Sequence, residues 1–135
     1  MSYQGNAFDT HVQQGDVHSR LLMYTADAVR AFLDDVARIG RGDDVAVMMF
    51  TEFGRRVEEN GSLGTDHGTA TPMFVVGKRV KGGLYSTHPS LTDLDDGNMK
   101  MTTDFRRVYA TVLADWLAVK GDVLGGTYEP LKLLA

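Results

Sequence analysis

The sequence predicts an α/β fold with a mostly parallel sheet and flanking helices, in one domain over residues 1–135. Three features predict it: a helical repeat of apolar residues over 18–39, two short apolar runs bounded by turn residues, and a second helical repeat over 104–119. Alternation of helices with buried strands is typical of parallel α/β sheets. Because ligands in such sheets bind beyond the carboxyl ends of the strands, we expect a site in the loops that begin there.

The first helix is predicted over residues 18–39, where Gly40 provides a stop. Asp16 is interpreted as its N-cap and His18 as a solvent-facing side chain. The apolar residues that share one helical face are Leu22, Ala26, Val29, Phe32, Leu33, Val36 and Ile39.

Two strands follow, over residues 45–50 and 72–77. Each is a continuous apolar run, which indicates a strand buried on both faces. A short strand near residues 6–8 would precede the first helix. The strand at 45–50 leads into a loop at 51–71, and the strand at 72–77 into a loop at 78–102; both loops have weak periodicity. Loops of this length in a compact domain are usually functional.

The last helix is predicted over residues 104–119. Thr103 is its expected N-cap, Asp104 places negative charge in the first turn, and Gly121 ends it. Its apolar stripe consists of Phe105, Val108, Tyr109, Val112, Leu113, Trp116 and Leu117.

Composition excludes several classes of protein. Hydrophobic residues make up 43% and charged residues 24%, which is ordinary for a globular chain and too apolar for a disordered one. A net charge of -4 argues against a nucleic-acid partner. Cysteine is absent, so no disulfide or thiolate site can form. No apolar run is long enough to span a membrane, so we expect no membrane partner.

The segment Thr65-Asp66-His67-Gly68 offers the best candidate site. A carboxylate and a neutral imidazole that are adjacent in a tight loop can bind one or two divalent cations. Asp9 and His11 form a second candidate pair, because side chains two residues apart on an extended chain share one side. The alternative is that Asp66 caps a turn and that His67 is merely exposed.

Three polar residues upstream could assist such a site. Glu52 follows a predicted buried strand and could bind a metal, orient a ligand histidine or act as a base. Arg55 could bind an anionic oxygen, and Asn60 lies between these residues and Asp66. The alternative for Glu52 and Arg55 is a surface ion pair that contributes little to stability.

Several segments together resemble one bacterial family, number 1501 among the domains of unknown function. They are FDTH near the start, MFTEFGRRVEENGSLGTDHGTATPMFVVG in the middle and VKGGLYSTHPSLTDLDDGNMKMTTDFRRVYATVLADWL towards the end. The resemblance covers about residues 8–117. This family is sulfatase-like and is related to the alkaline phosphatase and sulfatase superfamily.

The resemblance implies one or two divalent metals, Zn, Mn, Mg or Ca, at the sheet edge, and hydrolysis of phosphate or sulfate esters. Asp66 and His67 match the adjacent metal ligands of the superfamily, and Asp9 and His11 look like those of the other metal position. Glu52, Arg55 and Asn60 match positions typical of the family, with roles that the resemblance leaves open. Arg55 is a candidate contact for a developing oxyanion.

The chain resembles only the C-terminal part of this family, and the superfamily nucleophile belongs to the N-terminal part. No catalytic residue is therefore assigned. We expect a fragment or shortened relative of a metal-dependent hydrolase, which binds metal but does not catalyse alone. The alternative is a non-catalytic α/β module that self-associates, with a vestigial or absent metal site. The expected partner is a second copy or the missing N-terminal part.

The resemblance also bears on localisation. Family members are often exported by the twin-arginine route. Residues 1–10, however, have neither a basic nor an apolar leader region. We therefore expect no signal peptide in this sequence, and the compartment is left open.

Overall fold

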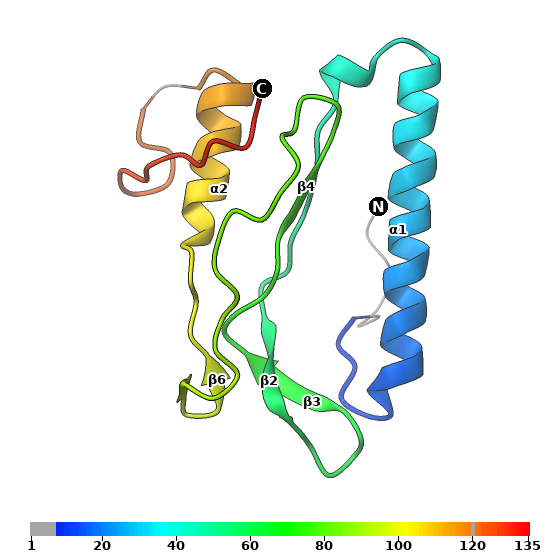
Figure 1. Ribbon diagram of the computed structural model, residues 1–135, viewed down its shortest axis with the longest axis vertical. Helices are drawn as coiled ribbons and strands as arrows, with labels where there is room; N and C mark the ends of the chain where they lie inside the picture. Colours follow the sequence, from blue (N-terminus) through cyan, green and yellow to red (C-terminus); the bar gives the residue numbers. More distant parts are fainter. Residues whose placement is uncertain (1–7, 120) are drawn as a thin grey trace.

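The computed structural model describes residues 8–119 and 121–135. A long antiparallel ribbon runs through the middle of the molecule, with helix α1 on one side and helix α2 on the other (Figure 1). The helical elements are α1 (Gln14–Arg38), the 3-10 turn η1 (Gly42–Asp44), α2 (Phe105–Thr111) and the π-helical turn η2 (Val112–Trp116). The strands are β1 (Val47–Met49), β2 (Gly54–Glu59), β3 (Thr65–Gly68), β4 (Phe74–Val76), β5 (Leu94–Asp95) and β6 (Asn98–Met99).

The predicted parallel sheet is wrong. Each strand pair in the described residues is antiparallel: β1 with β4, β2 with β3 and β5 with β6. A parallel pair needs a crossover connection, usually a helix, between its strands. The chain between β1 and β4 is instead the β2–β3 hairpin, so β4 returns alongside β1 in the opposite direction. The pairs Val47↔Val76 and Gly54↔Gly68 are nested in one ribbon.

Both predicted loops contain hairpins. In 51–71 the turn begins at Asn60-Gly61, a strong turn signal, and closes with a hydrogen bond from the Asn60 amide to the Gly64 carbonyl, 2.8 Å. In 78–102 the turn is Asp96-Gly97, whose φ angles of 46° and 77° are both positive. A two-residue turn of this kind matches the twist of the flanking strands, and Asp-Gly is one of the dipeptides that favour it.

The predicted helices are present with different ends. Gln13, with a left-handed φ of 44°, is the N-cap of α1, and Asp16 lies within the first turn. The stop at Gly40 is confirmed, with a φ of 75°. Asp104, not Thr103, caps α2 through its side chain, which accepts a hydrogen bond from the Arg106 amide at 2.9 Å.

The last helix is also shorter than predicted. It passes into the π-helical turn at Val112 and ends at Trp116, before Ala118 turns left-handed with a φ of 51°. Of the predicted strand at 6–8, positions 6 and 7 lie outside the described residues and Phe8 is in a turn.

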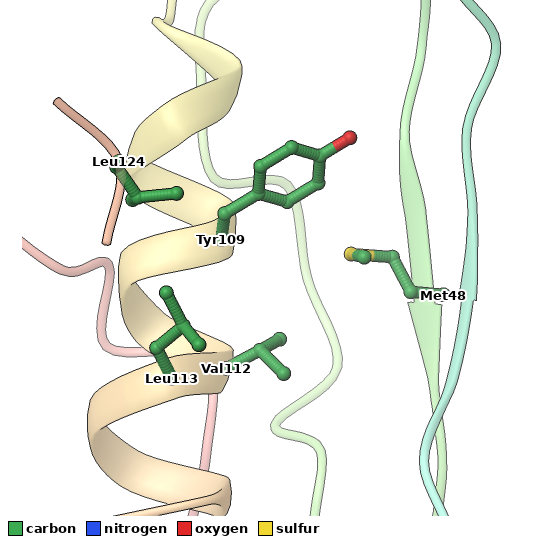
Figure 2. Close-up of a pocket in the computed structure, with 5 residues that line it drawn as sticks. All are labelled: Met48, Tyr109, Val112, Leu113 and Leu124. Carbon is green, nitrogen blue, oxygen red and sulfur yellow. The ribbon is translucent and has the colours of Figure 1, made fainter. Parts of the chain in front are cut away.

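The hydrophobic core is thin. Its buried apolar residues, within the described ranges, are Val36, Ala70, Val108 and Leu133. The fully buried Thr111 hydroxyl accepts a hydrogen bond from the Leu131 amide at 2.7 Å, which holds the C-terminal segment on α2. Between α2 and β1 an open apolar groove of about 250 Å³ is lined by Met48, Tyr109, Val112, Leu113 and Leu124 (Figure 2). The described helices include none with the length and apolarity needed to cross a bilayer.

The ribbon depends on Gly54, where β2 passes close to residue 70. A Cβ atom at this position would lie 1.8 Å from the Ala70 carbonyl oxygen. We expect Gly54→Ala to lower the free energy of unfolding by about 1–3 kcal/mol, because the backbone must shift to relieve the overlap. Gly61→Ala is the matched control, since no atom lies within 4 Å of a Cβ there. Urea denaturation measures both, and equal stability of the two variants would contradict this packing.

Candidate metal centre

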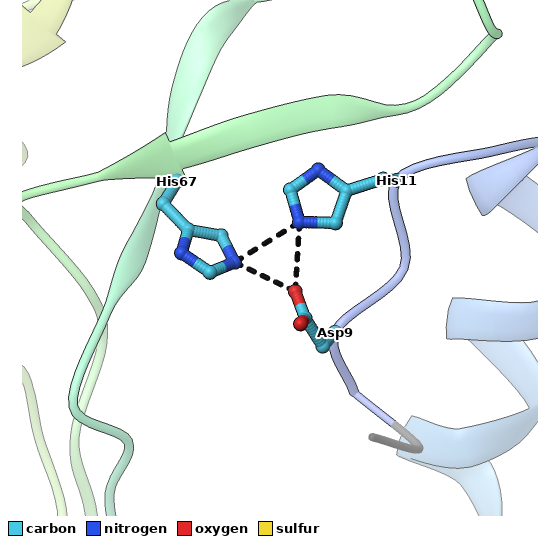
Figure 3. Close-up of side chains that lie close together, drawn as sticks. All are labelled: Asp9, His11 and His67. Carbon is cyan, nitrogen blue, oxygen red and sulfur yellow. Dashed lines mark hydrogen bonds and ion pairs between the residues drawn. The ribbon is translucent and has the colours of Figure 1, made fainter.

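Three side chains from distant parts of the chain converge at one point. Asp9 and His11 precede α1, and His67 lies on β3 (Figure 3). The Asp9 Oδ1 atom is 2.8 Å from His11 Nε2 and 2.6 Å from His67 Nε2. The two Nε2 atoms are 3.1 Å apart. The predicted pairs Asp9–His11 and Asp66–His67 therefore each contribute to one cluster.

This geometry fits the ligand sphere of a single metal ion. Neighbouring ligand atoms of a tetrahedral zinc are about 3.3 Å apart, because each lies about 2.0 Å from the metal. The separations in the cluster are slightly shorter, so outward movements below about 1 Å would admit the ion. Atoms that bear lone pairs repel at such distances unless a proton or a cation lies between them.

Arg55 positions the segment that carries Asp9. Its guanidinium donates hydrogen bonds to the Thr65 carbonyl at 2.7 Å and to the Phe8 carbonyl at 2.8 Å. One side chain thus joins the start of β3 to the residue before Asp9. The same guanidinium lies 3.8 Å from Asp9 Oδ1. The alternative interpretation, a surface ion pair between Glu52 and Arg55, is wrong, because Arg55 pairs with Asp9 instead.

Asn60 positions the segment that carries His11. Its side-chain amide donates to the His11 carbonyl at 3.1 Å, while its oxygen accepts from the Ser62 and Gly64 amides. Gly64 is required for this contact, because a Cβ atom there would lie 2.2 Å from the His11 carbonyl oxygen. The turn of the β2–β3 hairpin therefore packs directly against the residues before α1.

Asp66 lies on the other side of His11, away from the convergence point. Adjacent residues on a strand point in opposite directions, so His67 and Asp66 on β3 diverge. The Asp66 carboxylate is 3.6 Å from His11 Nδ1 and accepts a hydrogen bond from Asn60 at 3.1 Å. That bond is the main cause that lowers the pKa of Asp66 from its ordinary value. A carboxylate beside Nδ1 favours the tautomer in which His11 Nε2 is free to bind a metal.

The Asp9 carboxyl is also held in its ionised form. The hydrogen bond from His67 is the main cause that lowers the pKa of Asp9, and the charge of His11 adds to it. An ionised carboxylate is the form that ligates a cation, whereas the imidazole protons that favour this form would be released when a metal binds.

Phe53 belongs to the site although its sequence pattern did not indicate it. Its ring stacks on His67 at a centroid distance of 3.8 Å and an angle of 11°. Period-two alternation along the extended chain could have found Phe53, since it places this ring on the same side as Arg55. The Arg55 guanidinium lies 5.2 Å from the Phe53 ring. The same alternation places Glu52 on the side of the chain opposite to Phe53 and Arg55. Glu52 is exposed and lies outside the cluster.

A second hydrogen-bond network behind the cluster was also missed. The Thr10 hydroxyl is buried and lies 3.1 Å from His18 Nδ1, and the Gln14 amide donates to it at 2.9 Å. Thr65 on β3 donates to the other end of Gln14 at 2.8 Å. His18 therefore faces the protein rather than solvent, contrary to the prediction, and links α1 to the segment that carries Asp9 and His11.

Comparison of the sequence with models of protein families gives a match. The model described as a protein of unknown function, DUF1501, matches residues 2–126. The chain belongs to the DUF1501 family. Membership confirms the resemblance carried by the FDTH and TDHG segments, which contain the three clustered residues of this DUF1501 chain. No curated protein and no solved structure matches the chain.

In this DUF1501 chain His18 makes stability depend on pH. Burial, and after it the charge of Arg55, lowers the pKa of His18 from its ordinary value of 6.5. The unfolded chain therefore binds the proton more readily, so the contribution of His18 is complete above pH 6.5 and is lost as the pH falls below that value. We expect His18→Gln to flatten the fall in unfolding free energy between about pH 6.5 and pH 5.

Urea denaturation across this range, in the presence of a chelator, measures the slope for each variant. The exposed His88 provides the matched control, because His88→Gln is expected to leave the slope unchanged. An identical slope for His18→Gln and the unmodified chain would show that His18 titrates freely in the folded state.

Proposed function

We propose that this DUF1501 chain is a divalent-cation-binding domain whose ligands are Asp9 Oδ1, His11 Nε2 and His67 Nε2. The observation that carries the proposal is their convergence, with every pair of these atoms within 3.1 Å. Two imidazoles and one carboxylate favour zinc or another transition metal such as Mn²⁺, and they disfavour Mg²⁺ and Ca²⁺, which prefer oxygen ligands.

The exposure of the ligands supports an open site. The side chains of Asp9, His11 and His67 are 30%, 41% and 45% exposed. Three protein ligands with solvent access are typical of catalytic zinc sites, where the fourth position is left for water or substrate, whereas structural zinc sites are closed by four ligands. A metal bound here would supply a Lewis acid at the surface of the molecule.

We further propose that ester cleavage, implied by the likeness of the family to sulfatases and phosphatases, needs residues beyond those of the cluster. Among the described residues, the side chains that pair or stack with the three ligands are Phe53, Arg55 and Asp66, and none is a hydroxyl. Arg55 is 17% exposed and already donates to two carbonyls, so it is suited to positioning rather than to binding an oxyanion. These features support a chain that binds metal and does not hydrolyse esters by itself.

Metal binding is tested by titrating the chelator-treated chain with Zn²⁺, Mn²⁺ and Fe²⁺ in a calorimeter. We expect one zinc ion per chain, with binding abolished in His67→Ala because a ligand is lost. His88→Ala is the matched control, since His88 is exposed and its one hydrogen bond within the described residues is to the neighbouring backbone carbonyl of Pro89. Absence of binding by the unmodified, folded chain for all three metals would refute the proposal.

Asp66→Asn distinguishes an orienting carboxylate from a direct ligand. This change keeps the size and the acceptor oxygen of the side chain but removes its charge. If Asp66 orients His11, Asp66→Asn should lower the zinc affinity by about 10- to 100-fold. Stoichiometric binding should then persist at higher zinc concentration. Loss of binding as complete as in His67→Ala would place Asp66 in the ligand sphere.

The hydrolase proposal is tested with p-nitrophenyl phosphate and p-nitrophenyl sulfate. We expect no turnover above that of free metal by the zinc-loaded chain, because no hydroxyl side chain of residues 8–119 and 121–135 contacts the three proposed ligands. His67→Ala treated in the same way is the control for contaminating enzymes. Turnover that disappears in His67→Ala would overturn the non-catalytic part of the proposal and would leave the metal site intact.

A further inference from the structure

One face of α1 carries apolar side chains that nothing in the described chain covers. Val17, Tyr24, Phe32 and Ile39 are 48%, 52%, 49% and 64% exposed. With Ala28 they form a stripe along the helix, because residues spaced by three, four, seven and eight positions share a face. We call these five residues the α1 stripe. It extends about 33 Å from Val17 to Ile39 at 1.5 Å per residue.

The α1 stripe is distinct from the side of the helix that faces the ribbon. That side includes His18, Thr25 and Val29, which are half-buried, and Val36, which is the one buried residue of α1. Figure 1 shows α1 along one flank of the molecule, so one long side of the helix is open. A helix of 25 residues with a single buried side chain gains little stability from packing within its own chain.

The total surface also indicates a missing contact. The chain exposes 9,625 Å², whereas a monomer of 14.8 kDa is expected to expose about 7,000 Å². The excess is more than twice the roughly 800 Å² that each partner contributes to a standard interface. The surface available therefore exceeds what a stable dimer needs.

We propose that the α1 stripe is the interface of a homodimer in which two α1 helices pack antiparallel about a two-fold axis at Ala28. The stripe is symmetric about this residue: Tyr24 and Phe32 lie four positions before and after it, and Val17 and Ile39 lie eleven positions before and after it. A two-fold axis there places Tyr24 against the partner's Phe32 and Val17 against the partner's Ile39, each twice. Such self-complementarity is what an isologous interface requires.

Residue size and charge agree with this arrangement. Alanine at the axis lets the two helices approach to about 8 Å, the short end of the usual range. The same spacing places Asp35 and the half-buried Leu21 on the face of the stripe, so antiparallel alignment sets Asp35 opposite the partner's Leu21 and next to the partner's Arg20. Asp35 also pairs with Arg38 of its own chain at 3.1 Å. The charges of α1 are four Asp and three Arg, so the helix lacks the basic excess that would favour an anionic lipid surface as the occupant.

The absence of cysteine permits a direct test in the full chain. In a dimer of this geometry, Ala28→Cys should form a disulfide-linked species of twice 14.8 kDa on mild oxidation, since facing Cα atoms at the axis fall within disulfide reach. Ala26→Cys is the matched control: residue 26 is also exposed, but lies on the opposite side of the helix and should remain unlinked. Equal cross-linking of the two variants, or none in Ala28→Cys, would overturn the interface.

Light scattering after size exclusion, with a chelator present, tests the same surface without a covalent bond. We expect the unmodified chain to have twice the monomer mass at 100 µM, and Tyr24→Glu to weaken dimerisation at least 10-fold. Met23→Glu is the matched control, since Met23 is equally exposed at 50% but lies off the stripe. A monomeric unmodified chain at this concentration, or equal weakening by both substitutions, would refute the proposal. If Tyr24→Glu fails to fold, the cysteine pair decides.

Discussion

The site depends on one interaction above all, the two hydrogen bonds that the Arg55 guanidinium donates to the carbonyls of Phe8 and Thr65. These bonds join two segments separated by more than fifty residues, and each segment carries one part of the cluster. A planar guanidinium with several donors can hold two carbonyls in a defined relation, which a lysine ammonium cannot. Removal of Arg55 would leave these carbonyls without their partner and Asp9 without its positive neighbour.

The β2–β3 hairpin decides which side chains face the cluster. Alternation along extended backbone places His67 towards the convergence point and Asp66 behind His11. The glycines of the hairpin allow backbones to approach where any side chain would intrude, Gly54 at residue 70 and Gly64 at His11. The high glycine content of the chain, 15 of 135 residues, thus has a geometric explanation near the site. The segments that carry Asp9, His11 and His67 are held by hydrogen bonds to their main-chain carbonyls, and these bonds organise the cluster.

The thin core and the open site have a common origin in the ribbon. A two-stranded ribbon offers each helix a narrow surface, so α1 and α2 cover little of it and of each other. A broad sheet would bury the strands on both faces, as the apolar runs of the sequence predicted, yet Phe74 on β4 is 53% exposed. The proposed association with a second copy would bury the α1 stripe, which is part of the apolar surface left open in this way.

The sequence by itself determined the local structure: the helix of α1 with its Gly40 stop, the position of β4, the family, and the residue pairs Asp9–His11 and Asp66–His67. Each follows from short-range spacing or from motifs, which a linear pattern contains in full. Tertiary structure decided the rest. An apolar run predicts a strand but not its direction, and here the hairpin between β1 and β4 made the pair antiparallel. Only the folded chain selected Asp9, His11 and His67 from the candidates and excluded Glu52, because their convergence depends on contacts between residues far apart in sequence.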